Sequence, residues 1–399
     1  MSVMHPKVRI NENFGRLATQ YLFTEIEARA ATYTETHSDK KLLRLGIGDV
    51  TLPLPPTVVK AMAKAAREMG TPSGFRGYPP GNGYDFLRRA IAARYNDEGI
   101  AVDENEVFIS DGAKSDIGDL CALFGDTPIL AVTPAYPVYR DLALLSGRNI
   151  VYVAGTRENG FLPLPDACPE TPHLILLCSP GNPTGTAYTE KGLRAWIRYA
   201  ENSGSLILFD VAYRAFMPPT AVRSVYAVCD ARHVAVEYGS FSKSAGFTGI
   251  RCGYAVIPSA LRTADGHSVA ALHMRRKAIR SNGVSYITQR GAEAALSEKG
   301  RRECENNLLY YRENAALLAA FFKEKNFFFT GGDVSPYLFV ACPEGMDSRA
   351  FFDLLLNDGG IVTTPGIGFG EAGEGYVRFS AFAQRDDVLL AVERMKNLL

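Results

Sequence analysis

The chain has 399 residues, of which 47% are hydrophobic and 22% are charged, and its 43 basic side chains balance its 43 acidic ones. This size and composition predict a globular protein with a large domain and a smaller one, and the neutral balance gives no reason to expect nucleic acid or a membrane surface as a partner. Seven scattered cysteines without C-x-x-C spacing and six histidines without ligand spacing argue against a disulfide framework and a metal site, and favour a reducing compartment.

The N-terminal region shows no targeting or membrane signal. Residues 1–14 lack the pattern of a signal peptide, and no apolar run in the sequence approaches the ~18 residues that a membrane span needs. We therefore expect a soluble, cytoplasmic protein whose N-terminal arm joins the smaller domain.

From about residue 106, short apolar runs alternate with helical stretches. Most of these runs are continuously apolar, as expected for strands that helices cover on both faces. The pattern predicts an α/β fold whose large domain has a seven-stranded, mostly parallel sheet sandwiched by helices. The expected strands are Glu106–Ser110, Pro128–Thr133, Asn149–Val153, His173–Cys178, Ser205–Phe209, His233–Tyr238 and Cys252–Ile257.

Beyond about residue 285 the pattern changes. One long helical stretch, Ser285–Lys325, leads to short strands at Tyr337–Ala341 and Tyr376–Ser380, which predicts a smaller α+β domain completed by the N-terminal arm. The expected limits are 1–57 for the arm and part of the small domain, 58–302 for the large domain, and 303–399 for the rest of the small domain. One short basic cluster is predicted to be a solvated helix face: Arg275, Arg276, Lys277 and Arg280.

The ends of the predicted strands carry the polar residues. In such sheets a ligand lies beyond the carboxyl ends of the strands. The first strand is followed by Asp111, Gly112, Ala113 and Lys114 and then by a helix, and a helix that opens on small residues can bind an anion such as a phosphate. Lys114 has the alternative role of a solvated residue in the first helical turn.

The strand His173–Cys178 is followed by S-P-G-N-P-T-G, with Asn182 in the middle of a rigid turn. The Asn182 amide can donate to a cofactor ring oxygen or to a substrate carboxylate. We expect a cis peptide between Asn182 and Pro183.

Asp210 ends another strand, where its carboxylate is costly to bury unless a cation such as a protonated pyridine nitrogen meets it. The alternative is a helix N-cap. Tyr213, three residues later, could reach a ring hydroxyl.

The run E-Y-G-S-F-S-K-S-A-G-F-T-G-I-R ends the sixth strand. Ser240, Ser242 and Arg251 offer two hydroxyls and a guanidinium to a phosphate, and Lys243 lies among small residues, where lysine is rarely found without a reason.

S-P-G-N-P-T-G, D-V-A-Y and S-F-S-K-S-A-G-F-T-G-I-R-C-G resemble, in order and spacing, the signature of the fold-type-I pyridoxal-phosphate aminotransferases. The resemblance implies pyridoxal 5′-phosphate as cofactor and Lys243 as the catalytic lysine, which bonds to it and moves the substrate proton. Burial and Arg251 would lower the pKa of this lysine, and Gly246 and Gly249 would let the chain fold tightly around the cofactor. Asp210 would keep the pyridine nitrogen protonated.

The same resemblance extends to residues outside these motifs. Tyr136 resembles the aromatic residue that stacks on the cofactor ring, and Tyr78 the tyrosine that reaches the phosphate from a second subunit, which implies a homodimer. Arg378, in V-R-F-S, is suited to bind a substrate carboxylate with both guanidinium nitrogens. The G-F-G-E-A-G run at 368–373 precedes a strand rather than a helix, so we reject it as a dinucleotide-binding motif.

Further stretches resemble the subfamily of LL-diaminopimelate aminotransferases: Y-L-F at 21–23, L-G-I-G-D at 45–49, I-S-D-G-A-K-S-D at 109–116 and S-N-G at 281–283. This resemblance adds Asn282 to the cofactor contacts. It implies as substrate contacts Tyr21, Gly48, Lys114, Tyr136, Asn182, Asn282 and Arg378. Tyr21 has the alternative role of packing the arm.

One departure from the subfamily concerns the substrate. Gly81 stands where that subfamily usually has an acidic or otherwise substantial side chain, which would pair with the distal ammonium of diaminopimelate. The favoured expectation is transamination between glutamate and LL-2,6-diaminopimelate in lysine biosynthesis. The alternatives are an aminotransferase for aspartate or aromatic amino acids, a carbon–sulfur lyase, and a non-catalytic regulator that binds the same cofactor.

Overall fold

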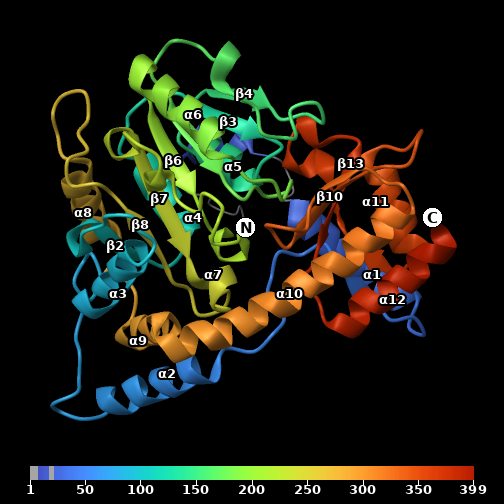
Figure 1. The fold of residues 1–399 in the computed structure, drawn as a ribbon, viewed down its shortest axis with the longest axis horizontal. Coiled ribbons are helices and arrows are strands. Elements are labelled where there is room, and N and C mark those ends of the chain that lie inside the picture. Colours follow the sequence, from blue (N-terminus) through green and yellow to red (C-terminus); the bar gives the residue numbers. More distant parts are fainter. Residues whose placement is uncertain (1–7, 18–21) are drawn as a thin grey trace, which may run out of the picture.

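The computed structural model describes residues 8–17 and 22–399, and these residues form three β-sheets surrounded by helices (Figure 1). The largest sheet has seven strands in the order β2-β8-β7-β6-β5-β3-β4. Strands β3 to β7 pair in parallel, and β8 runs antiparallel to both β2 and β7. The predicted fold is confirmed, and the strand ends differ from the prediction by one or two residues: β2 (Val107–Ser110), β3 (Ile129–Thr133), β4 (Ile150–Ala154), β5 (Leu174–Cys178), β6 (Leu206–Asp210), β7 (Ala235–Ser240) and β8 (Gly253–Val256).

Both faces of this sheet are buried. Successive residues of a strand point to opposite faces, so each strand contributes side chains to two cores. Ile207 and Phe209 of β6 lie in one apolar core and Leu208 lies in the other. This two-sided burial explains why the strands are continuously apolar in the sequence. The first core is covered by α3 (Asp85–Asn96), α6 (Glu190–Ser203) and α9 (Tyr286–Leu296), and the second by α4 (Ala113–Cys121), α5 (Pro137–Leu145) and α8 (Val269–Arg280).

The predicted single helix over Ser285–Lys325 is wrong, because the chain forms two helices there, α9 and α10 (Glu298–Glu324). Ser297 separates them with extended backbone, and its side chain accepts a hydrogen bond from the N–H of Gly300 as an N-cap. A Cβ atom at Gly300 would lie 1.9 Å from the carbonyl oxygen of Ala294, so the junction requires glycine at this position. Helix α2 (Pro56–Met69) packs against α9 (Figure 1).

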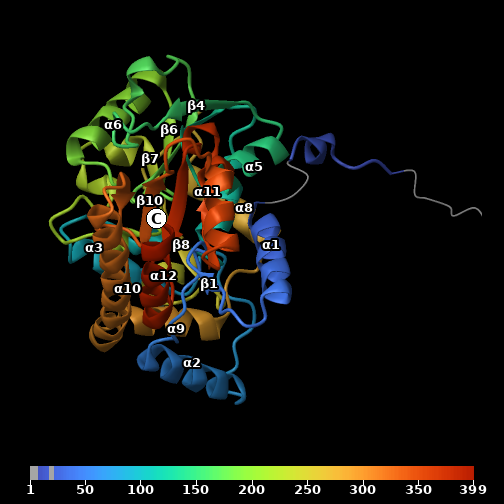
Figure 2. The same ribbon diagram turned by 90° about the vertical axis from the view of Figure 1, so that its right-hand side faces the viewer.

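A third apolar core lies around the smaller sheets. Figure 2 shows this part of the fold from a second direction. Its four-stranded sheet has the order β12-β13-β10-β9, and both strands predicted in this region have the predicted ends. Helix α10 runs from the first core, through Cys304, to this one, through Leu318. The expected limit between 302 and 303 falls inside this helix, so the domain limits stay a prediction. The elements of this part are β9 (Phe329–Gly331), β10 (Tyr337–Ala341), β12 (Thr364–Pro365), β13 (Tyr376–Ser380), the parallel pair β1 (Leu43–Arg44) and β11 (Ile361–Val362), and the helices α1 (Leu22–Thr36), α11 (Ser348–Asn357) and α12 (Arg385–Leu398).

The basic cluster on α8 is only partly a solvated face, and the prediction is wrong for Lys277. This side chain is buried near the buried carboxyl of Asp116 on α4. Arg276 and Arg280 each place Nε 3.1 Å from Oδ1 of Asp119. The cluster therefore ties α8 to α4 through these charge pairs.

Within residues 8–17 and 22–399, no helix is long and apolar enough to cross a membrane. The same residues contain no group of three or more His, Cys, Asp or Glu side chains that could hold a metal ion. All seven cysteines are free thiols.

Candidate functional site

A cavity of about 590 Å³ lies at the edge where β5, β6 and β7 end, between the large sheet and the smaller core. The carboxyl ends of parallel strands meet at this edge, as expected for a ligand site. Most of the predicted site residues line it, from segments spread over more than three hundred positions. They are Gly48, Ala113, Lys114, Tyr136, Asn182, Asp210, Tyr213, Ser240, Ser242, Lys243, Arg251 and Arg378.

Lys243 lies in the cavity on the one-turn helix α7 (Phe241–Ser244), which follows β7 directly. Its Nζ donates a hydrogen bond to the carbonyl oxygen of Gly48. Burial lowers the pKa of Lys243 to about 8; Asp49 opposes this shift, and Arg378 and Arg251 add to it. The predicted lowering is therefore confirmed, with Arg378 as a contributor that the sequence did not reveal. An amine with this pKa is a far better nucleophile and base near neutral pH than an ordinary lysine.

Two glycines, Gly246 and Gly249, were expected to let the chain fold tightly near Lys243, and only Gly246 has a backbone conformation that favours glycine. Gly246 has φ +80°, a left-handed conformation that favours glycine. Gly249 has no atom within 4 Å of an added Cβ and no such φ, so the fold does not require glycine there.

Asp210, the last residue of β6, places a buried carboxylate on the floor of the cavity. Its Oδ2 accepts a hydrogen bond from the Tyr139 hydroxyl at 2.8 Å, and its Oδ1 accepts one from the N–H of Ala212 at 2.9 Å. Burial raises the pKa of Asp210, and these two hydrogen bonds lower it. The carboxylate thus caps a turn rather than a helix, and it is oriented to meet a cation inside the cavity.

One end of the cavity has the donors that a phosphate needs. Helix α4 begins there at Ala113, and Arg251 Nη1 lies 3.4 Å from Oγ of Ser242, with Ser240 beside it. Gly112 has φ 138°, and a Cβ on it would lie 2.5 Å from Nη2 of Arg251. The glycine therefore leaves the helix N-terminus and the guanidinium open to the same anion.

Arg378, which is 1% exposed on β13, also lines the cavity. Its Nη1 donates to Oδ1 of Asn182 at 2.6 Å, and its Nη2 donates to the carbonyl oxygen of Gly46. The peptide between Asn182 and Pro183 is cis, as predicted. Arginine and asparagine are therefore held together where a substrate carboxylate can bind both.

Two aromatic residues at the site were not found from the sequence. Tyr337, at the start of β10, lies under the Arg378 guanidinium, with 4.4 Å from Cζ to the ring centroid, and its hydroxyl is 2.9 Å from that of Tyr213. Tyr139, on α5 one turn after Tyr136, is the partner of Asp210 described above. Tyr139 could have been found from its position three residues after Tyr136 at the start of one helix. Nothing in the sequence relates Tyr337 to Arg378 or Tyr213.

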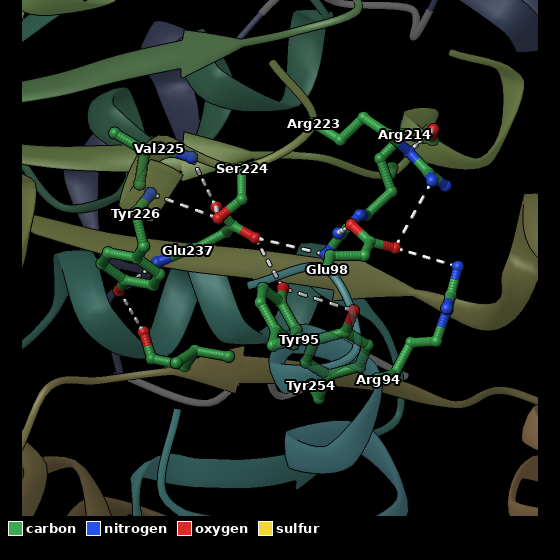
Figure 3. Close-up of polar contacts among 12 residues, drawn as sticks. Arg94, Tyr95, Glu98, Arg214, Arg223, Ser224, Val225, Tyr226, Glu237 and Tyr254 are labelled. Atoms are coloured by element: carbon green, nitrogen blue, oxygen red, sulfur yellow. Dashed lines mark hydrogen bonds and ion pairs between the residues drawn. The ribbon is translucent and has the colours of Figure 1, made fainter. Parts of the chain in front are cut away.

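A buried polar network supports the two segments that carry Tyr213 and Lys243 (Figure 3). Glu237 of β7 is fully buried; it accepts a hydrogen bond from the Tyr95 hydroxyl at 2.5 Å, and one of its oxygens lies 3.6 Å from Nη1 of Arg214. Arg214 directly follows Tyr213, so the network joins the segment after β6 to the strand that leads to Lys243. Its other members include Glu98, Ser224 and Val225.

Two predicted residues that the structure describes, Tyr78 and Asn282, are not part of the cavity as this single chain forms it. Tyr78 is 85% exposed, and Asn282 lies in an exposed loop. Their loops are adjacent, because a Cβ on Gly283 would lie 3.3 Å from Cγ of Pro79. Tyr21 lies outside the described residues. The rejected G-F-G-E-A-G run forms two short 3₁₀ turns before β13, and it begins no α-helix.

The chain matches known proteins over nearly its whole length. Residues 40–393 match the family model described as aminotransferase class I and II. The LL-diaminopimelate aminotransferase of Agathobacter rectalis is 42% identical over 406 residues, with 98% of this chain and 100% of that protein covered. The enzyme of the same name from Parabacteroides distasonis is 43% identical, with 98% and 99% covered. The solved L,L-diaminopimelate aminotransferase from Chlamydomonas reinhardtii has a TM-score of 0.92 and 40% identity, with 98% and 99% of the two chains covered.

Proposed function

The chain belongs to the class I and II aminotransferases, and we propose that it transfers an amino group from glutamate to tetrahydrodipicolinate, opened to its keto form. The products are 2-oxoglutarate and LL-2,6-diaminopimelate, and the reaction can run in either direction. The observation that carries this proposal is one cavity that unites a lysine of lowered pKa, a buried carboxylate and a buried arginine: Lys243, Asp210 and Arg378. The similarity over the whole chain to proteins of that activity supports the choice of substrate.

We propose pyridoxal 5′-phosphate as the cofactor, because the residues present fit each part of it. The N-terminus of α4, Ser240, Ser242 and Arg251 would hold the phosphate, and Gly112 leaves the space that a Cβ would fill. Asp210 would hold the proton of the ring nitrogen. Tyr136, Tyr213 and Asn182 line the cavity where the ring and its hydroxyl would lie. When bound, the cofactor supplies a ring that accepts the electrons released at the substrate Cα.

The chain's own residues would carry out the remaining tasks. Arg378 and Asn182 bind the substrate α-carboxylate and so orient the Cα–H bond. Lys243 Nζ, with its pKa near 8, would move the proton between the substrate Cα and the C4′ position of the cofactor. Tyr337 and Gly48 fix the guanidinium and the amine, because the tyrosine ring lies under Arg378 and the Gly48 carbonyl accepts from Lys243.

We propose a homodimer in which Tyr78 and Asn282 reach the cavity of the second copy. The adjacent loops that carry Tyr78 and Asn282 support this, because side chains exposed at this surface include the large apolar Phe75 and Ile279, at 63% and 79%. We also propose a cytoplasmic location, which the dispersed, odd-numbered cysteines support.

The test is a half-reaction on purified protein loaded with pyridoxal phosphate. LL-diaminopimelate, meso-diaminopimelate, glutamate, aspartate and phenylalanine are added singly, and amino transfer is followed by the change in cofactor absorption. We expect transfer from LL-diaminopimelate and glutamate. Transfer from aspartate or phenylalanine, with LL-diaminopimelate inactive, would keep the transaminase and reject the substrate.

A matched pair of variants tests the role of Lys243. We expect Lys243→Ala to abolish transfer while its far-ultraviolet circular dichroism matches that of the unaltered chain. Lys191→Ala, which removes an exposed lysine at the start of α6, serves as the control. Transfer by Lys243→Ala at the rate of the control would contradict the assignment.

A further inference from the structure

Two further cavities lie beside the helix that carries Lys243. Their volumes are about 110 and 150 Å³, and they adjoin, because six residues line both of them; we call them together the α7 recess. The shared residues are Arg94, Ala215, Arg223, Phe241, Ser244 and Leu296. Phe241 and Ser244 are the first and last residues of α7, so the recess contacts both ends of the helix that carries Lys243.

The α7 recess shares part of its wall with the cavity that contains Lys243. Ala212 and Ser240 line both. Ser240 is the last residue of β7 and directly precedes α7, and Ala212 directly precedes Tyr213. An occupant of the recess would therefore contact the two backbone segments that carry Lys243 and Tyr213.

The walls of the α7 recess are rich in arginine. Four arginine side chains line it, whereas the carboxylates that line it, among the described residues, are Glu98 and Glu305. The four are Arg94, Arg214, Arg223 and Arg301. Glu305 already forms an ion pair with Arg312 of α10. Positive charge therefore exceeds negative charge on the walls of the recess.

Glu98 is shared among three of these arginines (Figure 3). Its Oε2 lies 2.7 Å from Nη2 of Arg214, and its Oε1 lies 3.0 Å from Nη2 of Arg94. The same Oε1 lies 3.4 Å from Nη1 of Arg223. Arg214 has a second carboxylate nearby, because Oε1 of Glu237 lies 3.6 Å from its Nη1. Arg94 and Arg223 thus share a single oxygen of a single carboxylate.

The Arg223 guanidinium has donor capacity for a further acceptor. Within residues 8–17 and 22–399, it makes one hydrogen bond, from Nε to the carbonyl oxygen of Arg214 at 3.4 Å, besides its contact with Glu98. Burial lowers the pKa of Arg223; Glu98 opposes this shift, and Arg214 and Arg94 add to it. The side chain is 17% exposed, so an ion can reach it from solvent. A negative charge there would offset the repulsion between the neighbouring guanidinium groups.

We propose that the α7 recess binds a small oxyanion, with the chemistry of inorganic phosphate, between Arg94 and Arg223. Guanidinium groups bind phosphate oxygens through two parallel N–H bonds, and the recess supplies more than one such group. Arg301 lies on its solvent side, since this side chain is 40% exposed and pairs at 3.7 Å with Asp97, which is 59% exposed. The site is separate from the cofactor phosphate site, whose Arg251 lines the other cavity. It does not depend on which amino acid the enzyme uses.

The test uses the protein loaded with pyridoxal phosphate, so that the cofactor phosphate site is filled. Inorganic phosphate is the probe, at constant ionic strength, and the width of its ³¹P resonance gives its Kd separately from the cofactor signal. We expect saturable binding that Arg223→Met weakens roughly 10- to 150-fold, the range for a hydrogen bond to a charged group. Arg301→Met should weaken it by at least about threefold, and it replaces Arg223→Met if that variant does not fold.

Arg302→Met is the matched control for these variants. Arg302 follows Arg301 on α10, but its side chain is 69% exposed and pairs with Glu298 of the same helix. We expect this variant to bind phosphate as the unaltered chain does.

A second measurement tests whether the ion acts on Lys243. Added phosphate should raise the pH midpoint of the absorption of the bound cofactor, because a negative charge near the lysine nitrogen favours its protonated form. The rise should be lost in Arg223→Met and kept in Arg302→Met. A midpoint that stays constant while phosphate binds would overturn the action on Lys243.

Other outcomes would overturn the site itself. One is the absence of saturable binding, and another is equal binding by Arg223→Met and Arg302→Met. Binding that Arg378→Gln abolishes and Arg223→Met leaves unchanged would place the ion in the substrate site instead. None of these results concerns amino transfer, so a failure of this inference is distinguishable from a failure of the proposed function.

Discussion

Removal of the Tyr139 hydroxyl is the most direct test of how the chain prepares Asp210 for the cofactor. The hydroxyl donates to Oδ2 of Asp210 at 2.8 Å, and both side chains are buried. In Tyr139→Phe, the carboxylate keeps the hydrogen bond from Ala212 and loses the other one. The pKa of Asp210 then rises further, because burial is less well opposed. The carboxylate is protonated more often, and the ring nitrogen of the cofactor less often.

The size of this effect follows from the geometry. A hydrogen bond to a charged group contributes about 1.5–3 kcal/mol, and 1.4 kcal/mol corresponds to about a factor of ten. If the lost bond is expressed mainly in cofactor binding, pyridoxal phosphate should bind roughly 10- to 150-fold more weakly. The phenyl ring keeps the packing against Tyr136, where the ring centroids are 5.9 Å apart.

Two measurements give this result independently of turnover. Titration of the cofactor-free protein with pyridoxal phosphate gives the Kd, and the ¹⁵N chemical shift of the labelled ring nitrogen reports its protonation. Tyr188→Phe is the control, because Tyr188 is also buried and donates at 3.0 Å, but to the carbonyl of Pro163 away from the cavity. The reasoning is refuted if Tyr139→Phe matches this control in both Kd and ring-nitrogen shift.

Three further predictions concern Lys243, Gly48 and the polar network around Glu237. In the cofactor-free protein, the rate at which Lys243 captures pyridoxal phosphate should rise with pH and level off above about 8, because its pKa is lowered to about 8; a rate that still rises at pH 10 would contradict this. Gly48→Ala should lower both kcat and the Tm, because the added Cβ would lie 2.4 Å from Oη of Tyr337. The control Gly249→Ala should leave the Tm unchanged, because nothing lies within 4 Å of its Cβ. Equal Tm values for the two variants would count against the close contact. Glu237→Ala should lower the free energy of unfolding by about 3–5 kcal/mol, because it removes the buried acceptor of Tyr95, Ser224 and Val225 and leaves Arg214 with Glu98 alone. Glu237→Gln should lower it less. Urea unfolding measures both, and a loss below about 1 kcal/mol for Glu237→Ala would contradict the role of the network.

The strands of the large sheet could be predicted from the sequence, because burial on both faces makes each strand a continuous apolar run. The sequence was also sufficient for most of the cavity because parallel strands bring their carboxyl ends together, so Asn182, Asp210 and Lys243 could be joined without coordinates. The cis peptide before Pro183 was predictable for a related reason, since the turn that carries it is short and rich in proline and glycine.

Contacts between distant parts of the chain were not predictable in this way. Tyr337 of β10 lies 124 positions from Tyr213, which is in the turn after β6, and neither residue has a local pattern that indicates the other. Lys277 was expected to be solvated because its helix is basic, but its side chain is buried near the carboxyl of Asp116 on another helix. The break at Ser297 was missed because no proline marks it; it depends on the Ser297 N-cap and on the close packing of Gly300 against the Ala294 carbonyl.

The parallel pair of β1 and β11 places Leu43 opposite Ile361, which is synthesised 318 residues later. At 5–20 residues per second, the nascent β1 would wait roughly 15 to 65 s for its partner. Leu43 and Leu45 are fully buried in the core that β11, β13 and α12 complete, so during this time they lack the surface that covers them. Arg378, on β13, emerges from the ribosome only after Ile361. Any chain that ends before residue 361 would therefore present an uncovered apolar strand near its start, and would be a substrate for chaperones or proteases rather than a partly active enzyme.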